Sequence, residues 1–347
     1  MEQKIIGVRD NLLKKDGTLN HIGYSKTFLL NYNKEDIKNK NRVKEWDYYY
    51  ISDSRYGLCL TISNLSFAGV ISASVIDFYE PKDYNKTSLL FFPKDKVVLP
   101  KTSKEGISYL KTKDAEFTFE VKEGVRLLKG IYKNFYGKGY ENSDLEFEIE
   151  LTKEPKESIV KSTPFKNKKH FYYNQKINCM IASGHFTVNG RVYEFNKSNS
   201  LATLDWGRGV LPYSTLWYWA SMQTKHTDGK MLGFNLGKAL GDNTEATENC
   251  IFYNGKTHKL GDVRIKIQRE GDKRDYMGTW TFYSDDRRLE LVFEPIIDRY
   301  APFNALVLAF IPHQVFGKYT GKLILDDGKE IEIKDVLGFA ERVVNRW

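Results

Sequence analysis

Apolar and polar residues alternate with a period of two along much of this chain. In Leu145–Leu151 (L-E-F-E-I-E-L) every second position is apolar, and the positions between them are glutamates. Because successive side chains of a β-strand point to opposite faces, this pattern predicts a strand with one buried and one solvated face. The same alternation predicts four further strands, at Glu116–Val121, Val263–Ile267, Trp280–Phe282 and Leu289–Phe293.

One turn signal predicts a hairpin together with its register. The N-G dipeptide at 189–190 favours a two-residue turn, because both residues readily adopt the positive φ angles that such a turn requires. The turn pairs Val188 with Arg191 and sets His185 opposite Glu194. We therefore expect these last two side chains to lie on the same face of the hairpin.

Two more hairpins are predicted farther along the chain. A second N-G dipeptide, at 254–255, folds C-I-F-Y onto K-T-H-K. Near the C-terminus, a two-residue loop would set Leu323 against Glu332, whereas a three-residue loop at Asp326–Gly328 sets it against Ile331. We prefer the three-residue loop, since it keeps one face of the hairpin apolar.

Helical periodicity is sparse. The polar segment Asn33–Lys44 is expected to be a loop or a short surface helix, and Asp335–Trp347 fits both a helical spacing and a strand alternation. Many short strands with little helix predict an all-β protein, organised as two tandem antiparallel barrels or barrel-like sandwiches. A proline- and lysine-rich stretch, Glu154–His170, suggests a division into halves 1–160 and 161–347, the second of which carries the D-W-G-R-G motif.

Composition supports this fold class and restricts the setting. Aromatic residues make up 14% of the chain, and Tyr and Phe favour strands. No apolar run is long enough to span a bilayer, and the first ten residues do not resemble a signal peptide. Three widely spaced cysteines, Cys59, Cys179 and Cys250, favour neither a disulfide framework nor a zinc site. We therefore expect a cytoplasmic protein that binds no metal.

The net charge of +8 has little functional meaning by itself, because the lysines are scattered among 45 acidic residues. The densest basic cluster, Lys166–His170, is either a solvated connector or a phosphate-binding patch, and we favour the connector. No nucleic-acid motif accompanies it, so no nucleic-acid partner is expected. G-R-G is too short for a dinucleotide or P-loop motif, and we expect no cofactor.

Two tryptophans on one predicted strand are the strongest candidates for ligand binding. Alternation within Leu216–Gln223 places Trp217 and Trp219 on one face, together with Ser221 and Gln223. Such a face could form the wall of a site for an apolar ligand with polar ends. Alternatively, the two rings plug the interior of a wide barrel, which is the interpretation we favour.

The neighbouring D-W-G-R-G motif combines a charge pair with two glycines. Gly207 and Gly209 would allow a sharp turn around Arg208, bringing it back to Asp205 at the entrance of the second barrel, with Trp206 packed against the loop. Asp205 is then either part of a structural corner or a catalytic acid. We favour the corner.

Further polar candidates are less specific. His185 and Glu194 are the nearest approach to an acid–base pair, although their face of the hairpin is the less apolar one and is expected to be exposed. A second group, Asn235, Glu248 and Asn249, either hydrogen-bonds the head group of a ligand or caps turns. Tyr213 is a candidate for ligand binding together with Trp206 and Arg208, and His313 and Glu341 complete the polar candidates. No motif of a nucleophilic hydrolase or a zinc enzyme is present.

Several motifs together resemble an uncharacterised bacterial family, domain of unknown function 2804. They are D-W-G-R-G-V-L-P-Y followed by L-W-Y-W, H-I-G-Y-S, W-D-Y-Y-Y-I, G-F-N-L-G-K-A-L, T-E-N-C-I-F-Y-N-G-K and the C-terminal stretch from His313. This family in turn distantly resembles proteins with two lipocalin-like barrels, which include hydroxyneurosporene synthase and tocopherol cyclase. The likeness favours a strand at the C-terminal end. No catalytic residue of those enzymes can be matched to a position here.

The resemblance implies a function that the residues alone do not specify. Those relatives protonate a double bond of a long apolar polyene. We therefore hypothesise that an apolar or amphipathic small molecule binds in a barrel pocket. The associated reaction would be acid-catalysed hydration or cyclisation, which is a lyase- or isomerase-like activity. The alternatives are a non-catalytic β scaffold and a carbohydrate-binding protein that acts through exposed tryptophans. The sequence leaves the ligand and the oligomeric state open.

Overall fold

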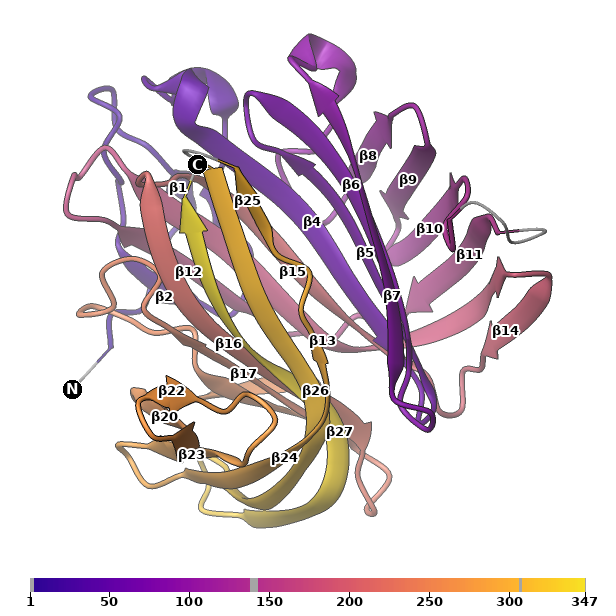
Figure 1. Ribbon diagram of the computed structural model, residues 1–347. Coiled ribbons are helices and arrows are strands. Elements are labelled where there is room, and N and C mark those ends of the chain that lie inside the picture. Colours follow the sequence, from indigo (N-terminus) through magenta and orange to yellow (C-terminus); the bar gives the residue numbers. More distant parts are fainter. Residues whose placement is uncertain (1–2, 138–142, 306–307, 347) are drawn as a thin grey trace.

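The computed structural model describes residues 3–137, 143–305 and 308–346, and two large, curled antiparallel β-sheets dominate it (Figure 1). The two short helical segments that precede β4 are 3₁₀ turns, η1 (Lys34–Asp36) and η2 (Lys40–Arg42), so the expectation of a loop or short helix there is met. A third 3₁₀ turn is η3 (Lys94–Lys96). None of the helices in the described ranges has the length and apolar character that crossing a membrane requires.

In the described ranges the first sheet has 13 strands. They are β2 (Gly23–Ser25), β4 (Val43–Ser52), β5 (Tyr56–Asn64), β6 (Ala68–Asp77), β7 (Lys82–Phe91), β8 (Gly106–Lys111), β9 (Ala115–Lys122), β10 (Val125–Tyr132), β11 (Leu145–Thr152), β12 (Ile159–Pro164), β13 (Phe171–Val188), β14 (Arg191–Phe195) and β15 (Leu201–Val210). Strands β1 (Asp10–Asn11) and β3 (Leu30–Asn31) form a separate parallel pair.

The second sheet has ten strands in the same ranges. They are β16 (Ser214–Lys225), β17 (Met231–Lys238), β18 (Cys250–Tyr253), β19 (Lys256–Lys259), β20 (Val263–Ile267), β23 (Trp280–Ser284), β24 (Leu289–Arg299), β25 (Phe303–Ala305), β26 (Leu308–Ile324) and β27 (Glu330–Arg346). Between β20 and β23 a small hairpin is formed by β21 (Arg269–Glu270) and β22 (Lys273–Arg274).

Each sheet curls until its ends approach each other. In the first sheet, whose main path runs β7-β6-β5-β4-β15-β13-β11-β10-β9-β8, the Ser88 hydroxyl of β7 donates to the Thr112 hydroxyl just after β8 at 2.8 Å. In the second sheet, the Lys238 ammonium of β17 donates to the Val263 carbonyl of β20 at 2.9 Å. The protein is therefore all-β with two barrel-like units, as the sequence predicts.

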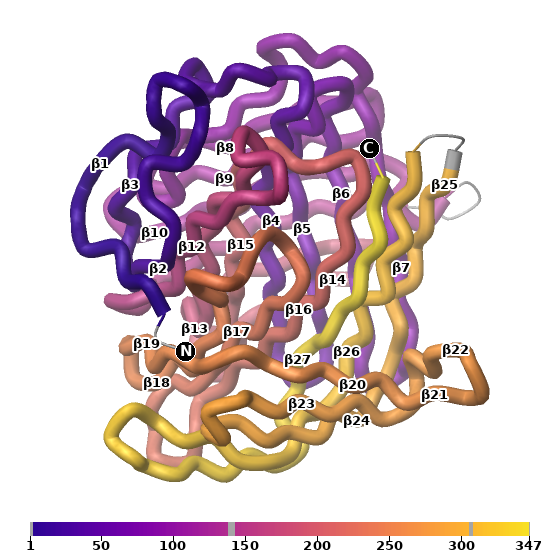
Figure 2. The backbone as a smooth tube through the Cα atoms, turned by 90° about the vertical axis from the view of Figure 1, so that its left-hand side faces the viewer, coloured from indigo at the N-terminus to yellow at the C-terminus, as the bar shows by residue number. Residues whose placement is uncertain are grey.

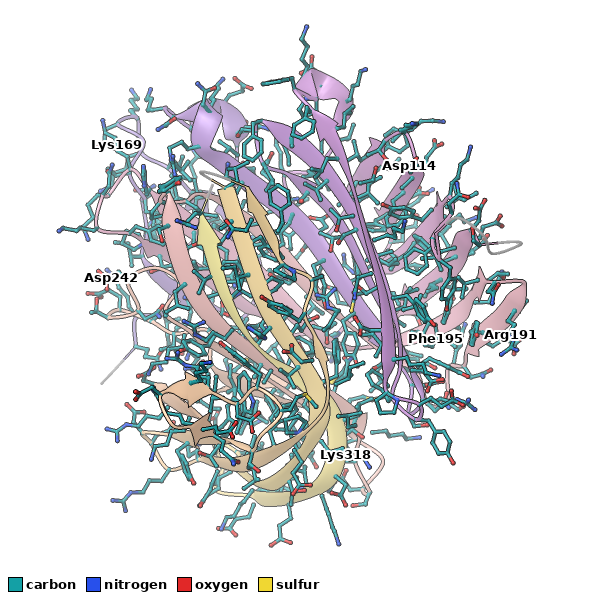
Figure 3. All side chains as sticks on the ribbon, in the orientation of Figure 1. Asp114, Lys169, Arg191, Phe195, Asp242 and Lys318 are labelled. Atoms are coloured by element: carbon teal, nitrogen blue, oxygen red, sulfur yellow. The ribbon has the colours of Figure 1, made fainter. Side chains whose placement is uncertain are left out.

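The interior of each unit is filled by side chains (Figure 3). Phe117, Phe119 and Trp206 are buried within the first core, and Trp280 and Tyr319 within the second. Each of these side chains is at most 1% exposed, so large aromatic residues occupy the centre of both units. Close packing of this kind leaves few voids larger than a water molecule.

The predicted hairpins have the predicted registers. His185 pairs with Glu194 across the turn at 189–190, and β18 pairs with β19 across the second N-G dipeptide. Leu323 lies opposite Ile331, which confirms the three-residue loop. The ambiguous C-terminal segment belongs to the long strand β27.

The strand that carries D-W-G-R-G lies in the first sheet rather than in the second. Strand β15 is hydrogen-bonded between β4 and β13, and the chain passes to the second sheet only between Val210 and Ser214. The stretch 154–170 contains β12, a strand of the first sheet, whereas we expected a crossover between halves there. Its prolines and lysines mark local turns, which composition cannot distinguish from a boundary between sheets.

The two sheets pack against each other along one side (Figures 1 and 2). A buried cluster fills this seam, with side chains from β4, β5 and β6 on one side and from β16, β24, β26 and β27 on the other. Its fully buried members are Tyr48, Tyr50, Cys59, Ile76, Phe78, Trp219, Ile297, Phe316 and Phe339. The half-buried rings of Trp46 and Trp217 pack against this cluster.

Candidate functional site

Strand β15 is buried on both faces because it lies between the first core and the seam. Trp206 belongs to the first core, where its indole makes edge contacts with Phe28, Tyr32 and Tyr173. Alternation then turns Asp205 to the opposite face, towards the second sheet. The expected packing of Trp206 against a loop is therefore wrong: it is a core residue.

Arg208 shares the inner face of the strand with Trp206. Its Nη2 lies 2.9 Å from Asp47 Oδ1 and donates to the Pro100 carbonyl at 3.0 Å. Nη1 donates to the carbonyl of Trp46 at 2.7 Å, and the guanidinium lies 4.2 Å from the centre of the Trp206 ring. The expected partner of Arg208, Asp205, is on the other face, so the prediction of an Asp205–Arg208 corner at a barrel entrance is wrong.

The two glycines of the motif serve close packing rather than a turn. Neither has a positive φ angle. A Cβ atom on Gly207 would lie 2.2 Å from the indole ring of Trp46, and one on Gly209 would lie 2.4 Å from the Phe171 carbonyl oxygen. Any larger residue would therefore push Trp46 or strand β13 away.

Asp205 is paired with a lysine in the seam. Its Oδ1 lies 2.7 Å from Lys176 Nζ, and its Oδ2 accepts a hydrogen bond from the Trp46 indole N–H at 3.1 Å. The Lys176 ammonium lies 3.9 Å from the centre of the Trp219 ring, within the range of a cation–π contact. Burial raises the pKa of Asp205, although Lys176 opposes this shift.

Trp219 is held rigidly on the second sheet. Its indole N–H donates to Asn235 Oδ1 at 2.7 Å, and Asn235 in turn donates to the backbone carbonyl of Glu248 at 3.0 Å. The ring makes edge contacts with Tyr48 and Phe339 and is 5% exposed. The tryptophan face of β16 therefore packs on the first sheet and neither plugs the second barrel nor stacks on a sugar from solvent.

Glu341 is the second carboxyl group of the seam and lies opposite Trp219 in the pairing of β16 with β27. Its Oε1 accepts a hydrogen bond from the Trp217 indole N–H at 2.7 Å, and its Oε2 accepts one from Gln314 Nε2 at 2.9 Å. Gln314 Oε1 accepts from the Tyr48 hydroxyl at 3.3 Å. Burial raises the pKa of Glu341 to about 7, so a large fraction of this group is protonated at neutral pH.

Glu248 is a third buried carboxylate, and it remains ionised. Asn174 of β13 donates a hydrogen bond to it. Burial alone would raise its pKa, but Lys176 and Lys161 bring the pKa below its ordinary value. Lys161 is itself buried and donates to Asn243 Oδ1 at 2.8 Å. We refer to Lys161, Lys176, Asp205, Glu248 and Glu341 together as the inter-sheet cluster.

The inter-sheet cluster combines a proton donor with surroundings that stabilise positive charge. Protonated Glu341 can transfer a proton, since its pKa is close to neutrality. The indole face of Trp219 already holds the Lys176 ammonium, which also interacts with Asp205 and with the ionised Glu248. Such a site suits chemistry in which a proton is added and a cation forms.

Other predicted residues lie outside this cluster. His185 and Glu194 are exposed on the outer face of the first sheet, where His185 borders a hollow of about 360 Å³ together with Lys129 and Glu148. Tyr213 is 46% exposed. Asn249 joins two backbone segments, since it accepts a hydrogen bond from the Gly237 N–H of β17 at 2.7 Å and donates one to the Gly261 carbonyl at 2.9 Å.

A second pocket lies between the sheets, away from Glu341. It has a volume of about 110 Å³ and is lined by Lys153, Pro155, Asn178, Cys179, Met231, Phe252, Asn254 and Gly255. A site for a drug-sized ligand needs roughly 300 Å³ or more. This pocket is too small for such a ligand, and no member of the inter-sheet cluster lines it. We therefore base the functional assignment on the chemistry of the inter-sheet cluster and not on this pocket.

Several residues of the seam were missed from the sequence. Lys176 and Lys161 lie in strands β13 and β12, where a lysine gives no sign that it is buried. Trp46 and Gln314 contact the carboxyl groups, but the family-like stretches that contain them gave no sign of this role. The one available signal was the pair of indoles in β16, which did point to this region.

A family model described as Domain of unknown function (DUF2804) matches residues 2–347. A search of curated proteins finds no match to the sequence. Among solved structures, a protein provisionally assigned as AttH from Nitrosomonas europaea has a TM-score of 0.52 at 11% identity, and the match covers 88% of this chain and 93% of that one. Kievitone hydratase from Nectria haematococca has a TM-score of 0.50 at 11% identity and is matched over 98% of both chains. These likenesses establish the two-barrel, lipocalin-like fold.

Proposed function

The chain belongs to the domain of unknown function 2804 family, and we propose that it binds an apolar, unsaturated small molecule at the seam between its sheets and protonates a double bond. The observation that carries this proposal is Glu341, a buried carboxyl group with a pKa of about 7 that lies among aromatic rings. A general acid works best when its pKa is close to the operating pH.

The reaction needs two parts, a proton donor and a site for the cation. Glu341 transfers its proton to one carbon of the double bond, and the other carbon becomes a carbocation. The aromatic rings of Trp217 and Tyr48, which are linked to Glu341 directly and through Gln314, respectively, stabilise this charge. Water then attacks the cation and returns a proton to the carboxylate, which gives hydration. Attack by a second double bond, followed by loss of a proton, gives cyclisation.

The fold supports this reaction class. Kievitone hydratase has a similar two-barrel arrangement, and its name describes the addition of water. At 11% identity its residues cannot be transferred to this chain. The chemistry proposed here therefore rests on Glu341 and its neighbours.

A second candidate function, a non-catalytic β scaffold, is favoured by the close packing of the molecule. The pocket of about 110 Å³ is too small for such a ligand, so an occupant of the seam must displace side chains. Trp46 and Trp217 are the candidates for this movement, because both are only half-buried. A scaffold protein would keep them in place.

Deuterium transfer from solvent tests the proposal directly. The protein is incubated in D₂O with a panel of isoprenoid alcohols such as farnesol, polyenes and unsaturated fatty acids, and carbon-bound deuterium is measured by mass spectrometry. We expect incorporation into at least one class. Glu341→Gln should lower the rate by at least about 100-fold, because a general acid contributes on this scale.

Glu194→Gln is the matched control, since it removes an exposed carboxylate at the edge of the first sheet and should leave the rate unchanged. Tryptophan fluorescence is titrated in parallel to measure binding. If no member of the panel alters the fluorescence and no deuterium is incorporated, the scaffold function is correct. Incorporation that survives Glu341→Gln would assign the proton to another group.

A further inference from the structure

We propose that the second sheet carries another binding site, on the opposite face from Glu341, which takes a planar phenolic molecule, and that Tyr276 closes this site as an internal substitute for the ligand. Four features carry the inference: the face on which the residues lie, a histidine–aspartate pair, an arginine that binds phenol oxygens, and the exposed hairpin that delivers Tyr276. No step depends on the reaction proposed for the seam.

The register of three strands separates the two sites. Gln314 and Glu341 face the seam, so their neighbours in sequence, His313 and Arg342, face the barrel side of the second sheet. His313 pairs with Arg342, which pairs with Tyr218 of β16. Two positions along, the same face carries Ala220, Ala340 and Val315 of the second core. The three polar side chains therefore lie beyond the end of the packed core.

Asp298 fixes the orientation of the His313 imidazole, which leaves one ring nitrogen available to a ligand. Its Nδ1 lies 2.7 Å from Asp298 Oδ2, and in the described part of the chain Nε2 makes no hydrogen bond. When Nδ1–H donates its hydrogen bond to Asp298, Nε2 of the neutral imidazole carries the lone pair and can accept a hydrogen bond from a ligand hydroxyl. The imidazole is stacked between Tyr276, at 3.5 Å and 6°, and Tyr300, at 4.5 Å and 16°.

Arg342 binds the oxygen atoms of two phenols. Its Nη1 donates to the Tyr276 hydroxyl and its Nε to the Tyr218 hydroxyl, both at 3.2 Å. A guanidinium has five N–H donors, so further donors remain for a ligand. Asp298 Oδ1 is buried and has no hydrogen-bond partner in the described ranges, which leaves an acceptor beside His313 as well.

Tyr276 reaches this site from a hairpin that is otherwise exposed. The four residues of β21 and β22 all lie on the surface, and Figure 2 shows the hairpin projecting from the second sheet. The Tyr276 carbonyl accepts a hydrogen bond from the Trp280 indole at 3.1 Å, while its ring lies on His313. The ring packs at the edge of the second core, beside Trp280, but the hairpin that precedes it is exposed, so the backbone on that side of Tyr276 can move without disturbing buried side chains.

The placement of the Tyr276 ring defines the chemistry of the ligand. The ring lies parallel to an imidazole and directs its oxygen to a guanidinium. A planar phenol reproduces both contacts, whereas an apolar ring such as toluene reproduces only the stacking and an aliphatic molecule reproduces neither. Because Tyr276 is tethered, it competes at a high effective concentration, on the order of millimolar for a short flexible connection. The free ligand must therefore bind more tightly than the tethered ring, or arrive at high concentration.

The test uses p-cresol, which has the same ring as a tyrosine side chain, and toluene, which lacks the oxygen. Both are titrated into the whole protein to about 10 mM, and the imidazole resonances of His313 are followed by NMR. We expect saturable shifts with p-cresol and none with toluene. Tyr276→Ala should bind p-cresol at least 10-fold more tightly than the parent protein.

Two further variants separate a binding site from a simple cavity. Arg342→Met in the Tyr276→Ala background should lower p-cresol affinity at least 10-fold, whereas a cavity that only accepts rings would bind p-cresol and toluene alike. Glu341→Gln should leave p-cresol binding unchanged, so failure of the proposed reaction does not bear on this site. The proposal is overturned if the parent protein shows no saturable shift, or if toluene binds as well as p-cresol.

Discussion

Two buried ion pairs on one strand have opposite surroundings. Arg208 pairs with Asp47 inside the first barrel, where its Nη1 and Nη2 also donate to the backbone carbonyls of Trp46 and Pro100. Asp205, three residues earlier, pairs with Lys176 in the seam, where aromatic rings of both sheets meet. The Arg208 side chain is 0% exposed, whereas that of Asp205 is 11% exposed. One face of β15 therefore lies in the core of the first barrel, and the other lies in the seam, where we propose that a ligand binds.

The same separation recurs on β26 and β27. Glu341 and Gln314 face the seam, while His313 and Arg342 face the end of the second barrel. In both places, neighbouring residues of one strand point to opposite faces, so each face carries a different set of polar groups. Substitutions on the two faces should therefore have different signatures, and the following predictions test this.

The largest effect is expected for Arg208→Met. Removal of the guanidinium leaves Asp47 buried without its cation, which should lower the free energy of unfolding by about 3–5 kcal/mol. Urea unfolding followed by circular dichroism measures the change. Arg191→Met, on the exposed hairpin, is the control and should unfold like the parent. A parent-like midpoint for Arg208→Met would contradict the structural role.

The next effect concerns Glu341 and depends on pH. Its pKa rises from an ordinary 4.5 to about 7 on folding, so the folded protein binds more protons than the unfolded chain between these values. The free energy of unfolding should therefore fall as the pH rises from 4.5 to 7. Glu341→Gln should remove this loss, which amounts to roughly 3 kcal/mol.

The measurement is a series of urea unfolding curves between pH 4.5 and pH 8. The difference between Glu341→Gln and the parent should favour the variant increasingly up to pH 7 and then level off. Glu194→Gln should follow the parent at every pH, since that carboxylate is exposed. Parallel curves for Glu341→Gln and the parent would mean that Glu341 is not buried as a neutral acid.

A smaller loss is expected for Lys176→Met. Asp205 then lacks its cation, but its partial exposure and the Trp46 indole N–H limit the penalty. The free energy of unfolding should fall by about 2 kcal/mol at pH 7, less than for Arg208→Met. The loss should shrink as the pH falls, because burial raises the pKa of Asp205 and the carboxyl group can take up a proton. A loss larger than that of Arg208→Met would reverse the contrast between the two faces.

The smallest effect is expected on the outer surface. His185→Ala and Glu194→Ala remove a cross-strand pair whose members are both exposed, and neither variant should unfold measurably differently from the parent. Differential scanning calorimetry is sufficient for this comparison. A clear drop in melting temperature, or any loss in the deuterium assay, would restore the pair as a candidate site.

The sequence predicted the strands and their hairpins well because those features are local. Leu145–Leu151 alternates as written, and the turn residues fixed two registers. It also named several residues that the structure brings into the inter-sheet cluster, among them Asp205, Glu248 and Glu341. It paired Asp205 with the wrong residue, since the proximity of Arg208 in sequence outweighed the possibility that the two side chains point apart.

What the sequence by itself determined is the pattern of two faces along each strand and the short turns between neighbours. Only the tertiary structure decided what covers each face, since both faces of β15 are buried and hydrophobicity does not distinguish them. The decisive contacts join distant segments: Trp46 and Asp205 are 159 residues apart, and Trp217 and Glu341 are 124 apart. Burial raises the pKa of Glu341, and that burial exists only after the two sheets have packed together.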